Sequence, residues 1–100
     1  MRKIEVTTAF RRDFKRESKG GYRKLLDTDL KQVIDALARD MPLPPKCRDH
    51  ALVGNWRAYR DCHVRPDWIL IYQLVAADSA TASPARLILA RLGSHAELNL

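Results

Sequence analysis

The chain has 100 residues, with 18 Lys or Arg and 12 Asp or Glu, so its formal net charge is +6 at pH 7. A chain of this length forms one core and buries roughly two thirds of its unfolded surface, so we expect a single domain over residues 1–100 with an open or shallow site. The excess of basic residues favours a polyanionic partner, either nucleic acid or an acidic protein.

Neither a signal peptide nor a membrane span is expected. The segment that follows the basic start is short and contains Glu5, and no apolar run reaches the roughly 18 to 20 residues that cross a bilayer. The two cysteines, Cys47 and Cys62, form neither a CxxC pair nor a dense framework. That usage is typical of a reduced chain, although a disulfide between them stays open. We expect a cytoplasmic protein without a membrane partner.

A short strand and a basic helix are predicted at the start of the chain. Residues 3–7 are rich in β-branched side chains in rough alternation, which predicts a strand. Thr7 or Thr8 can cap the following helix, in which Phe10 and Phe14 stand one turn apart. The remaining positions are mostly basic and fit either a solvated surface or a face that follows phosphates or a partner: Arg11, Arg12, Lys15, Arg16 and Lys19.

A second, amphipathic helix is predicted after Gly20-Gly21, since consecutive glycines end a helix. It should begin near Tyr22. Its apolar side chains recur every three or four residues: Leu26, Leu30, Val33, Ile34 and Leu37. The two helices should therefore lie together on one face of a sheet.

The second half of the chain predicts an antiparallel meander. The prolines in residues 41–45 exclude a helix there and lead into a loop. Alternation or a continuous apolar run then predicts strands at residues 56–64, 68–75 and 85–92, with a tight turn at 65–67. The resulting order, β-α-α-β-β-β, predicts an α+β fold: a mainly antiparallel four-stranded sheet with the two N-terminal helices packed on it.

All three histidines lie in two short segments. His50 and His63 belong to RDHALVGNWRAYRDCHVRPDW at residues 48–68, and His95 belongs to GSH at residues 93–95. The turn brings His63 close to Asp67, and the last strand brings His95 near them if it pairs with the strand at 68–75. We predict an active site at this end of the sheet.

Three chemistries can use such a set of residues. The histidines and Asp67 could hold zinc, although their spacing matches no compact metal motif. A hydrolase would need Cys62 or Ser94 as its nucleophile, but each is next to a histidine in sequence, and adjacent strand residues point to opposite faces.

The third chemistry is cleavage of RNA without a metal ion or other cofactor. Imidazoles suit the base and acid roles because they exchange protons near neutrality. Asp67 can orient an imidazole or act as the base. Arg91 or Arg60 could hold the phosphate.

The same residues resemble a known family. RDHALVGNWRAYRDCHVRPDWILIY followed by RLGSHAEL resembles the YafQ branch of the RelE/ParE superfamily, the toxins of type II toxin-antitoxin modules, most closely over residues 42–98. The resemblance implies a RelE-like domain that cleaves mRNA on the ribosome and inhibits translation. A cognate antitoxin, which should be acidic, would hold it inactive, and operator DNA would be contacted only through that antitoxin.

The resemblance also implies roles for individual residues. The implied catalytic residues are His50, His63, Asp67, His95 and Arg91. The residues expected to meet RNA or the ribosome are Trp68 beside the site, unless it belongs to the core, and Arg11, Arg12, Lys15, Arg16, Lys19, Arg48, Arg57, Arg60 and Arg65. The chain departs from the family at Asn99, where an aromatic residue normally follows the GSH element. The alternative function is a non-catalytic relative that binds protein or DNA.

Overall fold

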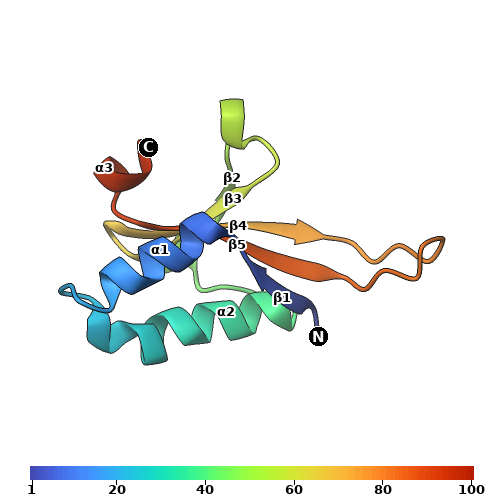
Figure 1. The fold of residues 1–100 in the computed structure, drawn as a ribbon, viewed down its shortest axis with the longest axis horizontal. Helices are drawn as coiled ribbons and strands as arrows, with labels where there is room; N and C mark the ends of the chain where they lie inside the picture. The colour runs from blue at the N-terminus through green and yellow to red at the C-terminus, as the bar shows by residue number, and fades with distance from the viewer.

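The computed structural model describes all residues from 1 to 100 and contains one five-stranded sheet (Figure 1). The strands are β1 (Lys3–Val6), β2 (His50–Ala51), β3 (Arg60–Arg65), β4 (Trp68–Val75) and β5 (Arg86–Gly93), and the α-helices are α1 (Thr8–Glu17), α2 (Lys31–Ala38) and α3 (His95–Leu98). The strand order is β1-β5-β4-β3-β2, with β1 parallel to β5 and every other pair antiparallel. None of the helices is both long enough and apolar enough to cross a membrane.

The α+β class and the mainly antiparallel sheet are confirmed, but the sheet has five strands instead of the expected four. The additional strand is β2, in which His50 and Ala51 pair with Asp61 and Arg60. Two residues are too few to show a periodic pattern, so the sequence alone placed them in a loop.

The strand predicted from residue 56 begins only at Arg60. Gly54 has a left-handed backbone with φ of 67°, and residues Gly54–Trp56 form a 3₁₀ turn. The amide of Tyr59 then donates to the carbonyl of Trp56, which closes a further turn. The extended conformation is therefore interrupted, and the prediction was wrong for residues 56–59.

Helix α1 and the helical segment that ends in α2 cover one face of the sheet. Thr7 caps α1 by accepting a hydrogen bond from the amide of Phe10 at 3.0 Å. Phe10 is buried, whereas Phe14 is 38 % exposed. The second helical segment starts irregularly, with a 3₁₀ turn and a π-helical turn before α2. Its apolar stripe packs with the sheet in a core whose fully buried members include Leu30, Trp68, Leu70, Tyr72, Leu87 and Leu92.

A smaller apolar cluster lies on the opposite face. Ile69, Ile71, Ala90 and Leu98 form it, and the loop after β2 packs against it through Leu52, Trp56 and Tyr59. In Figure 1, α2 lies below the sheet, and α3 and this loop lie above it.

Side chains of α1 complete the edge of β5 where β1 ends. β1 pairs only with residues Arg86 to Leu89. Beyond that point, Asp13 accepts a hydrogen bond from the amide of Leu92 at 3.0 Å, and Arg16 donates one to the carbonyl of Leu92 at 2.7 Å. Buried peptide groups need such partners, so α1 replaces the missing neighbouring strand.

Two arginines neutralise the Asp13 carboxylate, which is only 3 % exposed. Arg91 contacts it at 2.6 and 3.2 Å, and Arg16 contacts it at 2.9 Å. Burial disfavours ionisation of Asp13, but the hydrogen bonds from Arg91 and Leu92 and the charges of both arginines outweigh burial and lower its pKa. Asp13 is therefore ionised, and both of its oxygens accept hydrogen bonds that hold α1 against β5.

Asp13→Ala should lower the free energy of unfolding by roughly 3 to 5 kcal/mol, because it leaves a buried amide and two arginines without their partner. Since the folded-state pKa is depressed, this contribution is present above the unfolded pKa of about 3.9 and is lost as pH falls through the folded value. Urea unfolding at several pH values measures both effects. Asp27→Ala, at an exposed position, is the control, and an equal loss in both variants would contradict the assigned role.

Candidate active site

The strand register brings His63, Asp67 and His95 to one end of the sheet. His63 lies opposite Ile69 on β4, and Ile69 lies opposite Gly93 on β5. Asp67 belongs to the two-residue turn between β3 and β4, and His95 opens α3 directly after β5. The predicted convergence of these three residues is confirmed.

Asp67 orients His95. Its Oδ1 accepts the backbone amide of His95 at 2.9 Å and lies 2.6 Å from Nδ1 of the ring. The bond from that amide, followed by the ring contact, lowers the pKa of the Asp67 carboxyl. A carboxylate beside Nδ1 favours the tautomer with its proton there, so that Nε2, which faces His63, is the acceptor.

The three imidazoles form a row. Nε2 of His95 lies 3.4 Å from Nε2 of His63, with ring centroids 5.3 Å apart. On the other side of His63, the ring of His50 lies at 6.3 Å and is nearly parallel to it. Nδ1 of His50 lies 2.8 Å from the carbonyl of Arg48 and 2.9 Å from Oδ1 of Asp61. A carboxylate therefore lies at each end of the row.

Asp61 belongs to the site, although sequence reasoning did not select it. It alternates with His63 along β3, so the two side chains share the face opposite the helices, and this spacing was the available signal. Asp61 is 4 % exposed. The approach of His50 is not directed as a hydrogen bond, so Oδ1 of Asp61 has no hydrogen-bond partner, and neither has Nδ1 of His63. Burial raises the pKa of Asp61, and the nearby histidines oppose this effect.

Arg91 lies on β5 but bonds to α1. All its side-chain hydrogen bonds, through Nε and Nη2, go to Asp13, which raises the pKa of the guanidinium, and its side chain is 27 % exposed. Nη1 makes no hydrogen bond within the protein. Arg91 is thus near the end of β5, with one nitrogen left free.

The burial of Trp68 corrects its expected RNA contact, whereas the RNA contact of Arg60 stays a prediction. Trp68 is fully buried, stacks on Tyr22 with ring centroids 4.7 Å apart, and donates its Nε1–H to Glu17 at 3.0 Å. Arg60 lies opposite the core residue Tyr72, on the helix-covered face, and bonds to Asp49 at 3.2 and 3.3 Å. Neither side chain shares the face of the histidines.

Some of the other predicted basic residues form ion pairs within the protein, and the rest form none. Arg16 bonds to the carbonyl of Leu92 and pairs with the carboxylates of Asp13, Glu17 and Glu97, so it is structural and not a free RNA contact. Arg65 pairs with Asp29 at 2.8 Å. The predicted basic residues that are exposed and make no ion pair are Arg11, Arg12, Lys15, Lys19, Arg48 and Arg57.

The arrangement of side chains does not favour a zinc site or a hydrolase with a cysteine or serine nucleophile. No three His, Cys, Asp or Glu side chains are arranged to hold a metal ion. Cys62 is a buried free thiol in the core on the face away from His63, and burial raises its pKa, so it stays protonated. The hydroxyl of Ser94 accepts the amide of Glu97 in a capping box. Neither residue is an activated nucleophile.

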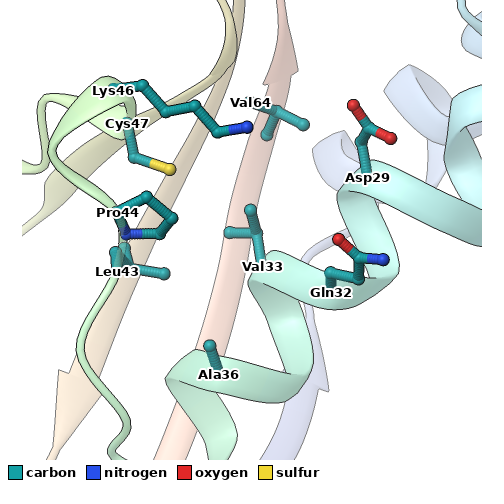
Figure 2. Close-up of a pocket in the computed structure, with 9 residues that line it drawn as sticks. All are labelled: Asp29, Gln32, Val33, Ala36, Leu43, Pro44, Lys46, Cys47 and Val64. Carbon is teal, nitrogen blue, oxygen red and sulfur yellow. The ribbon is translucent and has the colours of Figure 1, made fainter.

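A separate hollow of about 300 Å³ lies between α2 and the turn at Pro45–Cys47 (Figure 2). Pro44, Lys46 and Cys47 lie on one side, and Val33 and Gln32 of α2 lie on the other. No histidine lines it, so it is not part of the candidate active site.

Comparisons with known proteins agree with the motifs. A sequence model described as "Bacterial toxin of type II toxin-antitoxin system, YafQ" matches residues 2–100. The chain is 38 % identical over 98 residues to "mRNA interferase toxin YafQ" of Escherichia coli K12, covering 97 % of this chain and 95 % of that protein. It is 36 % identical over 98 residues to "Putative toxin YafQ" of Haemophilus influenzae, covering 98 % and 92 %.

A solved structure is similar over the same length. In the "Crystal structure of the E. coli DinJ-YafQ toxin-antitoxin complex", one chain is 38 % identical to this one, with a TM-score of 0.77. The alignment covers 97 % of this chain and 96 % of that chain.

Asp61→Asn should raise the free energy of unfolding at pH 7 by about 0.5 to 2 kcal/mol, the usual range for one stabilising substitution. The folded-state pKa of Asp61 lies above its unfolded value, so the penalty of the buried charge is present above the folded pKa and disappears below the unfolded one. The two proteins should therefore become equally stable near about pH 4. Urea unfolding at both pH values measures this, and a destabilised variant at pH 7 would mean that the histidines outweigh burial.

Proposed function

Because the chain belongs to the YafQ family of bacterial type II toxin-antitoxin toxins, we propose that it is an mRNA interferase that cleaves mRNA on the ribosome and so inhibits translation. The observation that carries this proposal is the contact chain from Asp67 through His95 to His63. Residues 1–100 act as one toxin domain, and the E. coli relative named an mRNA interferase shares 38 % of its residues over 98 positions.

The reaction starts with attack of the 2′-hydroxyl on the adjacent phosphorus. One imidazole removes the hydroxyl proton, and another protonates the leaving 5′-oxygen, which produces a 2′,3′-cyclic phosphate and a free 5′-hydroxyl. His63 and His95 suit these roles because their Nε2 atoms lie 3.4 Å apart, so both rings can reach the same phosphodiester. His50 extends the row and supplies a further acid-base group.

The extra charge on phosphorus needs a cation. Arg91 is the proposed residue, through the Nη1 that its contacts with Asp13 leave free. Asp13 then keeps the guanidinium in one orientation while that nitrogen approaches a phosphate oxygen. Every proton transfer is assigned to a side chain, and no metal ion or other cofactor is required.

The proposed partners follow from charge and family. The E. coli YafQ protein forms a complex with DinJ, and we expect a cognate antitoxin with an acidic segment that meets the unpaired cations of this chain. Operator DNA would be contacted only through that antitoxin. Ribosomes and mRNA place the action in the cytoplasm.

His95→Ala and Asp67→Asn should each lower mRNA cleavage by roughly 100- to 10,000-fold, the usual effect of losing a general acid or base or its orientation. Mapping of 5′ ends in cells that express each variant measures this, with circular dichroism to check the fold. Asp27→Asn, at an exposed position, is the matched control.

Full cleavage by a folded double variant would overturn the assignment of these two residues. Growth arrest by the unaltered chain without new 5′ ends would instead support the alternative, a non-catalytic binding module of the same fold.

The free cations of α1 and of the turn after it provide a second test. Arg11, Lys15 and Lys19 stand four residues apart and make no ion pair, so their replacement by Glu should weaken ribosome binding more than it weakens the fold. A second triple variant with the same charge change, at Lys24, Lys31 and Arg39, is the control. Co-sedimentation with ribosomes at several salt concentrations should give a shallower salt dependence for the first variant only. Equal binding by both variants would mean that Arg11, Lys15 and Lys19 form only a solvated surface.

A further inference from the structure

A cationic hollow lies beside the histidine row. It has a volume of about 320 Å³ and is lined only by Lys46, Arg48, His63 and Pro66. One of these residues, His63, also contacts His95 at 3.4 Å. The hollow therefore adjoins the site at His63, a ring that the proposed reaction uses.

The two cations of this hollow have no counterion. Neither Lys46 nor Arg48 takes part in an ion pair, and no acidic residue lines the hollow. A second basic hollow of about 340 Å³, at Arg12, Arg16 and Arg91, differs in this respect because Asp13 lines it and already neutralises two of its arginines. Two unpaired cations beside one hollow repel each other, and a bound anion would relieve that repulsion.

The backbone of Arg48 is held in an unfavourable conformation. Its φ of 47° and ψ of 40° are left-handed, a region that Gly and Asn adopt more readily. Cys47 before it is buried, and Asp49 after it bonds to Arg60 and Tyr72, so both flanks are fixed. The backbone of Arg48 beside the hollow is therefore held in place from both sides.

The same short segment is tied to the histidines. The carbonyl of Arg48 lies 2.8 Å from Nδ1 of His50, and His50 stacks near His63. A strand of RNA that runs across the imidazoles therefore has the hollow beside it. Ammonium and guanidinium groups without competing carboxylates are the groups that bind backbone phosphates.

We propose that Lys46, Arg48 and His63 form a subsite for the mRNA phosphate next to the one that is cleaved. This inference rests on the function proposed above and adds Lys46, which carries no role there. Because the phosphate bound here does not react, the contact contributes equally to the ground state and the transition state.

The test uses the full chain with Lys46→Ala and Arg48→Asn. Asn suits the left-handed backbone, so this variant keeps the fold. In ribosome-dependent cleavage, KM should rise about tenfold or more while kcat stays within about twofold, as expected when uniform binding is lost. Binding of a non-cleavable all-deoxy oligonucleotide, followed by anisotropy, should show a salt slope lower by roughly 0.7 for the one lost phosphate contact.

The control is Lys31→Ala with Arg39→Asn, which removes the same charge from α2 and its C-cap. It should leave KM and the salt slope unchanged. An unchanged KM and salt slope in the Lys46 and Arg48 variant would overturn the subsite. A decrease in kcat alone would also overturn it, because the hollow would then hold the reacting phosphate. Weaker ribosome binding with unchanged oligonucleotide binding would assign the hollow to ribosomal RNA and also overturn it.

The outcome is separable from that of the proposed function. If the unaltered chain does not cleave mRNA on ribosomes, the interferase assignment fails. The oligonucleotide measurement still reports whether the hollow binds a backbone phosphate.

Discussion

The bond between the Asp13 carboxylate and the amide of Leu92 is the interaction on which the active site depends. β1 is too short to reach this part of β5, so the last residues of β5 take their edge partners from α1. Gly93 follows, and a Cβ there would lie 2.9 Å from Nη2 of Arg16 and 3.2 Å from Oε1 of Glu97, so a larger residue would displace these side chains. The exit of β5 is therefore fixed, and with it the position of His95.

Two buried aspartates play opposite parts in this molecule. Asp13 is surrounded by donors and two arginines, so it stays ionised and contributes stability. Asp61 is buried beside imidazoles without a directed hydrogen bond, so its charge costs stability. A buried carboxylate with a structural role has hydrogen-bond partners for its oxygens. A buried carboxylate that lacks such partners and lies beside acid-base groups is typical of functional sites. Asp13 thus stabilises the fold, whereas Asp61 belongs to the candidate active site.

The sequence predicted the elements that periodicity can reveal. The amphipathic stripe of the second helix, the apolar run of β4 and the hairpin turn all carry local patterns, and the hairpin is enough to bring His63 to Asp67. Long-range pairing could not be predicted in the same way. Trp68, Arg60 and Arg16 were predicted to contact RNA. In the fold they bond to Glu17, Asp49 and Leu92 respectively, and no sequence pattern predicts these pairs. β2 was missed because two residues carry no period.

The departure at Asn99 leaves the geometry of His95 intact. Asn99 ends α3 in a left-handed conformation with φ of 62°, which asparagine adopts more readily than an aromatic residue does. The helix itself is held elsewhere, by the capping box between Ser94 and Glu97 and by the burial of Leu98 in the smaller cluster. Asp67 then fixes the ring of His95 from the hairpin turn. The contact between Asp67 and His95 therefore forms without an aromatic side chain at position 99.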